Sequence, residues 1–337
     1  MQSLILSSVA TGTIITMTSF HWLLAWVGLE LNTLAIIPII AKQHHPRSTE
    51  ATTKYFLTQA AASAMILFSS TMNAWTTGTW DISQMTNPPS CIMLTMALSM
   101  KLGLAPLHLW LPEVLQGTTL KTALIIATWQ KLAPFSLLFT VHNTINPTIL
   151  LMMAILSAMV GGWGGLNQTQ TRKILAFSSI AHLGWMTSIL TLNPNITLLN
   201  LVIYLLMTTP MFMMLMLTMS KTIKDLTTAW TISPSIAALS LILLMSLGGL
   251  PPLTGFMPKW LILQELTTHN LTMTATIMAL SALLSLFFYL RLSYTSALTM
   301  FPTTTKNTHK WRFQPKLATT PMALTTALSM LLLPMTP

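Results

Sequence analysis

Three lysines and one glutamate lie inside long apolar stretches of the sequence. Lys101 stands in MALSMKLGLAPLHLW, Lys131 in IIATWQKLAPF, Lys259 in LTGFMPKW and Glu30 in WLLAWVGLELNTLAIIP. A charged side chain at the centre of a bilayer costs roughly 2.5 to 3.5 kcal/mol on insertion scales, and such residues usually mark ion or proton paths. The residue types therefore predict a proton relay.

The relay hypothesis depends on how these charges are compensated. Three lysines against one glutamate give an excess of buried cations, so some of the groups are expected to be neutral or bridged by water. For Glu30 the alternative is an ion pair that only packs helices together. Lys259 has the alternative of snorkelling to the membrane interface, since it follows a helix break.

Two histidines, His108 and His182, also fall within apolar stretches. One alternative is haem ligation by two histidines on facing helices, but a di-haem cytochrome needs paired histidines at helical spacing, and these are single. The open alternatives are a hydrogen-bonded member of the relay and a core histidine that only satisfies its own hydrogen bonds.

The composition is that of a membrane protein. Of 337 residues, 53% are hydrophobic and 7% are charged, against about 25% charged in an ordinary soluble domain. We expect an all-α polytopic protein with a single transmembrane domain over residues 1–337. The net charge of +10 lies mostly in short connections between apolar runs, which favours lipid headgroups over nucleic acid as the partner.

The motifs of nucleotide and redox chemistry are missing from the sequence. Cys91 is the single cysteine, and no GxGxxG, P-loop or CxxC motif occurs. We therefore expect no cofactor and no metal bound by this chain.

Hydropathy predicts about eleven membrane spans, each of about 20 residues. Their expected ranges are 3–19, 22–40, 55–75, 92–111, 121–141, 148–166, 173–193, 196–219, 235–265 with a break, 271–291 and 318–335.

The basic residues divide unevenly between the two sides of these spans. The connections after even-numbered spans hold Lys42, Arg47, Lys54, Lys121, Arg172, Lys173, Lys221, Lys224, Arg291, Lys306, Lys310, Arg312 and Lys316, and those after odd-numbered spans hold none. Such a bias places the N-terminus and the basic loops on the inner face of the membrane and the C-terminus outside.

Two predicted spans are interrupted by helix-breaking residues. Pro106 interrupts the fourth span, and Gly248, Gly249, Pro251 and Pro252 interrupt the ninth. Each would be the fourth helix of a five-helix unit, one over residues 1–145 and the other over 146–292. Because five is odd, the second unit enters the membrane from the opposite face, as in many secondary transporters. Ordinary proline kinking is the alternative. Residues 293–337 would form a polar loop and a C-terminal helix.

Several long motifs resemble one known family. KLGLAPLHLWLPEV followed by Lys131, then NQTQTRKILAFSSIAHLGWM and SLGGLPPLTGFMPKW, are similar to signatures of the antiporter-like subunits of respiratory complex I and of multisubunit cation/proton antiporters. HWLLAWVGLELN, HPRSTEATTKYFLTQ and GGWGGLNQTQ narrow the resemblance to mitochondrially encoded members.

The resemblance implies two inverted units whose half-channels meet on a chain of buried charged residues. Glu30 would pair with Lys101 as a gate, and Lys131 would pass charge towards Lys259. It also implies neighbouring antiporter-like and small hydrophobic complex I subunits as partners, phospholipid including cardiolipin at the surface, and the mitochondrial inner membrane as the location. Members commonly have fourteen helices, so this chain is expected to lack three of them at the N-terminus.

Two other functions stay open at this point. In a structural subunit the buried charges would only hold helices together. A standalone cation/proton antiporter would need an acid-rich cation site, but Asp81, Glu113, Asp225 and Glu265 fall at span ends or in loops.

Overall fold

The computed structural model of the chain describes residues 2–42, 45–298 and 320–331. Within these ranges the chain is helical, with two isolated bridges and no named strand. The helices are α1 Gln2–Thr18, α2 Trp22–Ala41, α3 Pro46–Thr77, α4 Pro88–Leu102, α5 Trp110–Gly117, α6 Leu120–Ala127, η1 Trp129–Lys131, α7 Leu132–Thr140, α8 Pro147–Gly165, α9 Thr171–Ile189, α10 Pro194–Thr218, α11 Ile223–Ile232, α12 Pro234–Gly248, α13 Phe256–Thr268, α14 Thr272–Leu298 and α15 Thr320–Leu331. The basic residues expected at 306, 310, 312 and 316 lie outside the described residues.

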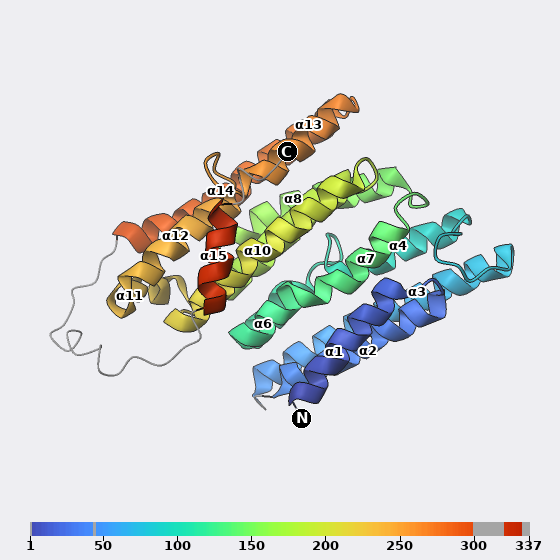
Figure 1. Cartoon of the computed structure of the whole chain (residues 1–337), viewed down its shortest axis with the longest axis horizontal. Helices are drawn as coiled ribbons and strands as arrows, with labels where there is room; N and C mark the ends of the chain where they lie inside the picture. Colours follow the sequence, from blue (N-terminus) through green and yellow to red (C-terminus); the bar gives the residue numbers. More distant parts are fainter. Residues whose placement is uncertain (1, 43–44, 299–319, 332–337) are drawn as a thin grey trace.

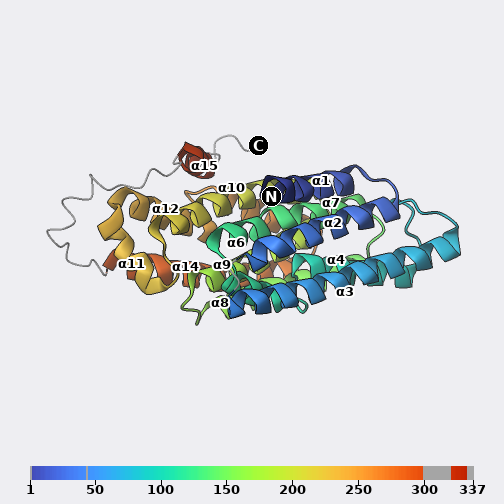
Figure 2. The ribbon, with the colours of Figure 1, turned by 90° about the horizontal axis from the view of Figure 1, so that it is seen from below.

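The helices form two neighbouring groups along the longest axis (Figures 1 and 2). One group contains α1 to α7, and the other contains α8 to α14 with α15 lying across α10 and α12. Helix α9 joins the two groups, since it packs on α5, α6, α8, α10 and α13.

Membrane-spanning length and apolarity are clear for part of the described chain. Five segments qualify, namely Trp22–Ala41, Leu120–Thr140, Pro147–Gly165, Pro194–Thr218 and Thr272–Leu298, and Ser3–Thr18 and Pro234–Gly248 are shorter apolar helices. The polytopic all-α class is thus confirmed, while the count of eleven spans stays a prediction. Helix α9 is less apolar because it is enclosed by protein and need not face lipid.

Both predicted helix breaks are present, and both have the same cap. Helix α4 is capped by Gly103 (φ 80°), whose N–H donates to the carbonyls of Ser99 and Met100. Helix α12 is capped by Gly249 (φ 82°), whose N–H donates to the carbonyls of Met245 and Ser246. Glycine is favoured at both sites because the left-handed conformation carries no Cβ penalty there.

A third interruption was not predicted. The span expected as continuous over 121–141 is divided into α6, the 3-10 turn η1 and α7. Pro134 accounts for the position of the break, because its ring removes the N–H that would bond the Gln130 carbonyl and clashes with that carbonyl.

Helices α1 and α2, like α8 and α9, approach closely at small residues. A Cβ added to Gly12 would lie 2.9 Å from the Gly28 carbonyl oxygen, and one added to Gly161 would lie 2.6 Å from the Ala181 nitrogen. The glycine-rich stretch that ends α8 therefore serves close helix packing.

Two short backbone bridges occur at corresponding places in the two groups. His21, before α2, pairs with Asp81, after α3, and Gln170, before α9, pairs with Thr222, after α10. In each bridge two N–H groups donate across the pair, all four at 3.1 Å: Trp22 to Trp80, Ile82 to Phe20, Thr171 to Lys221 and Ile223 to Thr169.

Candidate functional site

All three lysines of the expected relay are buried and stand at helix interruptions. Lys101 (5% exposed) is in the last turn of α4, Lys131 (5%) ends η1, and Lys259 (8%) is in the first turn of α13. Since backbone groups at a helix interruption lack their usual partners, these positions offer both charge and free hydrogen-bonding groups.

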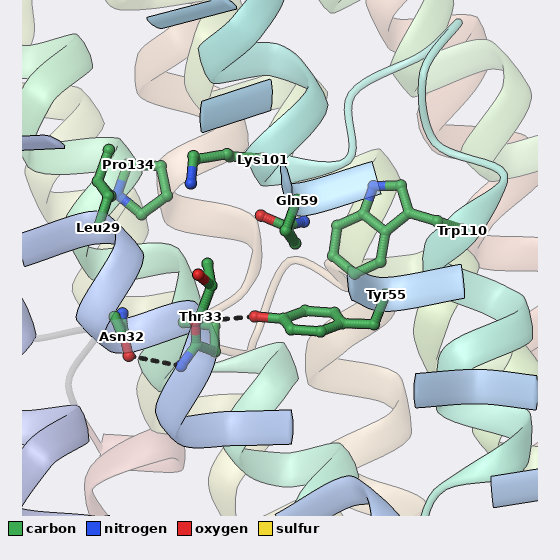
Figure 3. Close-up of a pocket in the computed structure, with 9 residues that line it drawn as sticks. Leu29, Asn32, Thr33, Tyr55, Gln59, Lys101, Trp110 and Pro134 are labelled. Atoms are coloured by element: carbon green, nitrogen blue, oxygen red, sulfur yellow. Dashed lines mark hydrogen bonds between the residues drawn. The ribbon is translucent and has the colours of Figure 1, made fainter. Parts of the chain in front are cut away.

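Lys101 lines a small cavity between the helices of the first group. The cavity is bounded by Leu29, Asn32, Thr33, Tyr55, Gln59, Lys101, Trp110, Gln130 and Pro134 (Figure 3). Its volume, counted for the centre of a water molecule, is about 10 Å³, which is about the room that one water needs. Within the described residues, the buried Nζ of Lys101 and Nε2 of Gln59 make no hydrogen bond to protein.

One side of this cavity is a hydrogen-bonded polar bridge. Gln130 Nε2 donates to Asn32 Oδ1 at 2.7 Å, and the Tyr55 hydroxyl donates to Gln130 Oε1 at 3.4 Å. Gln130 thereby connects α2, α3 and the interruption that carries Lys131.

Glu30 lies on α2, next in sequence to Leu29, which lines the Lys101 cavity. The described salt bridges do not include a Glu30–Lys101 pair, and the buried Glu30 Oε2 has no hydrogen-bond partner among the described residues. The gating ion pair therefore stays a prediction of the family resemblance.

Lys131 faces α10 rather than the Lys101 cavity. Its Nζ donates to the Tyr204 hydroxyl at 3.1 Å and lies 4.8 Å from the centroid of the Tyr204 ring. The Tyr204 hydroxyl in turn donates to the Ala127 carbonyl at 3.0 Å.

His182 lies beside Tyr204, the residue that holds Lys131. It is 7% exposed on α9, and its ring lies 5.5 Å from the Tyr204 ring. Whether His182 belongs to the relay or only packs in the core stays a prediction.

Lys259 reaches back towards its own helix break. Its Nζ donates to the Gly248 carbonyl at 2.9 Å, the last residue of α12. Because the side chain is buried and bonded there, the snorkelling alternative does not describe it.

His108 lies in the first break, two residues before α5. It is 9% exposed, and its buried Nδ1 makes no hydrogen bond to the described residues. No hydrogen bond, ion pair or ring contact among the described residues joins it to Lys131, Tyr204 or His182.

The two breaks also match in sequence without a gap. Residues 103–113, GLAPLHLWLPE, align with 249–259, GLPPLTGFMPK, sharing the glycine, two leucines and two prolines. Lys259 in the second segment corresponds to Glu113 in the first, and Thr254 corresponds to His108.

Comparison with known proteins decides the family. A family model described as NADH:quinone oxidoreductase/Mrp antiporter, TM, matches residues 19–285, and one described as NADH dehydrogenase subunit 2 C-terminus matches 286–337. NADH-ubiquinone oxidoreductase chain 2 of Salmo salar is 59% identical over 99% of this chain and 96% of its own length, and that of Xenopus laevis is 56% identical over 99% and 97%. The chain belongs to the NADH-ubiquinone oxidoreductase chain 2 family.

Solved structures agree with this family. A chain of respiratory complex I from Thermus thermophilus is 29% identical, with a TM-score of 0.85 over 98% of this chain and 79% of its own. A chain of the Mrp complex from Dietzia shares the fold, at 17% identity and a TM-score of 0.76 over 89% of this chain and 61% of its own. The chain is thus an antiporter-like, multi-pass membrane subunit of the complex I type.

Three site residues of this family member escaped the sequence analysis, namely Tyr204, Gln130 and Asn32. Nothing in their local sequence separates them from the many other polar residues in the spans. The sequence does contain one further signal of the site, which is the similarity of residues 103–113 to residues 249–259. This similarity places Lys259 at the position that Glu113 has after the first break.

Proposed function

We propose that the chain is a proton-translocating subunit of mitochondrial complex I. It would pass protons along Glu30, Lys101, Lys131, His182 and Lys259, driven by quinone reduction elsewhere in the complex. The main support is that all three buried lysines stand at helix interruptions. A charged side chain inside the membrane is costly, so three of them at such positions indicate a function. A change of charge at Glu30 would alter the proton affinity of Lys101, and the change would propagate along the chain of charges.

The relay would be built from two inverted units of five spans each. The first unit would cover residues 1–145 and the second 146–292, with a further segment at 293–337. Three matching features support the repeat: the glycine caps of α4 and α12, the two backbone bridges, and the similar segments 103–113 and 249–259. With α11 outside the count, α1 to α7 and α8 to α14 would each supply five spans, the eleventh being α15.

The proposed orientation follows the basic loops. The N-terminus and these loops would face the matrix, and the C-terminus would face the intermembrane space. Phospholipid, cardiolipin included, would meet the basic loops, and the protein partners would be neighbouring antiporter-like and small hydrophobic subunits of complex I. We propose no redox cofactor or metal for this chain.

The acidic residues at the surface are engaged in local contacts that do not resemble a cation site. The Lys54 Nζ lies 2.6 Å from a carboxylate oxygen of Glu113 and 2.5 Å from one of Glu50. Asp225 caps α11. The Glu265 carboxylate accepts a hydrogen bond from the Asn193 side-chain amide at 3.4 Å. Their separation on different elements favours a proton relay over a standalone cation/proton antiporter.

Replacing Lys101 by methionine tests the proposed function. Complex I carrying Lys101→Met should assemble normally, but coupled proton pumping in liposomes should fall roughly tenfold or more, because a proton-transfer group is lost. The exposed Lys121→Met is the matched control and should pump normally. Impaired assembly with unchanged pumping per assembled complex would instead indicate a structural subunit.

A further inference from the structure

The interruption between α6 and α7 replaces a backbone hydrogen bond with a side-chain one. In η1 the Lys131 N–H donates to Thr128, three residues back, at 3.4 Å. In an α-helix it would donate to Ala127, four residues back. The Ala127 carbonyl accepts instead from the Tyr204 hydroxyl of α10.

This contact fixes the direction in which Tyr204 uses its hydroxyl. A phenol has one O–H donor, and here that proton is committed to a carbonyl. Only its lone pairs are left for Lys131, whose Nζ donates to it at 3.1 Å. Because a backbone carbonyl does not take up a proton in this chemistry, Tyr204 holds Lys131 without passing its proton onward.

The same turn separates two adjacent side chains. Consecutive residues of a 3-10 helix project about 120° apart. Gln130 accordingly faces the Lys101 cavity, where it contacts Asn32 and Tyr55, while Lys131 faces Tyr204 and the neighbouring His182. The side chain of Lys131 is thus turned towards the second group of helices.

We propose that Tyr204 is a positioning residue that holds the Lys131 amine beside His182, on the outgoing side of the relay. The inference rests on the proposed function and adds to it a residue that sets which neighbour Lys131 can reach. The ring contributes as well as the hydroxyl, since Nζ lies 4.8 Å from its centroid, within the range of a cation–π contact. Both Tyr204 and Lys131 are buried, so bulk water does not compete for the amine.

Tyr204→Phe in the intact complex tests the proposal, because it keeps the ring and removes the hydroxyl. We expect normal assembly, and coupled proton pumping about threefold to tenfold slower, the cost of one hydrogen bond at the amine. Tyr294→Phe is the control, since Tyr294 is 67% exposed on α14 and should pump normally. A high-resolution structure of the Tyr204→Phe complex should show the amine moved away from His182.

A third variant, Lys131→Met, separates failure of this proposal from failure of the relay. If Lys131→Met abolishes pumping but Tyr204→Phe pumps fully with the amine unmoved, the positioning role is wrong and the relay stands. If Lys131→Met itself pumps normally, the relay and the positioning role both fail. A loss of assembled complex in Tyr204→Phe, with full pumping per remaining complex, would indicate a purely structural tyrosine and would also overturn the proposal.

Discussion

At the scale of residues, Gln130 and Lys131 are neighbours in sequence that serve different halves of the site. Gln130 supplies the polar bridge beside Lys101, and Lys131 contacts Tyr204. A helix with regular α geometry over this stretch would leave the Ala127 carbonyl bonded within the helix. The 3-10 turn therefore leaves the Ala127 carbonyl free to accept from Tyr204, which holds Lys131.

Gln130→Leu should destabilise the subunit. The substitution leaves the Asn32 amide oxygen, on a residue only 2% exposed, without its donor, which costs about 1–3 kcal/mol. Thermal denaturation of the purified complex would measure the change, and this subunit should be lost from the variant complex at a lower temperature. Gln264→Leu, on the exposed face of α13, is the control, and equal stability of the two variants would contradict the role given to the bridge.

At the scale of elements, the glycine that ends α12 fixes both the helix break and the place of Lys259. Gly249 has φ 82°, and a Cβ added there would lie 2.9 Å from Lys259 Nζ. Gly78 offers a matched site, since its φ is 72° and a Cβ there would meet no atom within 4 Å.

Comparing Gly249→Ala with Gly78→Ala should therefore separate two effects. Both variants strain the backbone, but only Gly249→Ala should displace the Lys259 amine. Each alanine carries a left-handed conformation that costs about 1–2 kcal/mol, so both complexes should be somewhat less stable. Only Gly249→Ala should lower proton pumping per assembled complex. Equal pumping by the two variants would show that the place of the Lys259 amine beside Gly249 does not set its function.

The breaks at Pro106 and at Gly248 to Pro252 were predictable because glycine and proline act on their own backbone. The break at Thr128 to Lys131 was missed, although Pro134 marks it, because an interior proline in a membrane helix more often produces a kink than a turn of different type. The partners of Lys131 were beyond prediction, since Tyr204 is 73 residues away in sequence and only packing brings it to the amine.

At the scale of the whole molecule, the proposed five-span units require connections to alternate between the two sides of the membrane. Lys121 follows the proposed fourth span and Asn195 follows the seventh, and both are exposed. Cys91 is buried, so it should not obscure labelling of an introduced thiol.

Single variants Lys121→Cys and Asn195→Cys should react with a membrane-impermeant thiol reagent from opposite sides. In inverted membrane vesicles Lys121→Cys is expected to label, and in mitoplasts Asn195→Cys is expected to label. Unsubstituted complex provides the background from Cys91. Labelling of both positions from the same side would refute the odd number of spans between them.

The proposed relay requires a continuous polar path that joins the buried lysines across the two groups of helices. A structure of the intact complex at a resolution that shows water would test it most directly. We expect waters and polar side chains, Gln130 among them, to link Lys101 to Lys131 and then to His182 and Lys259 in at least one state. A dry, apolar gap between Lys101 and Lys131 in every state would contradict it.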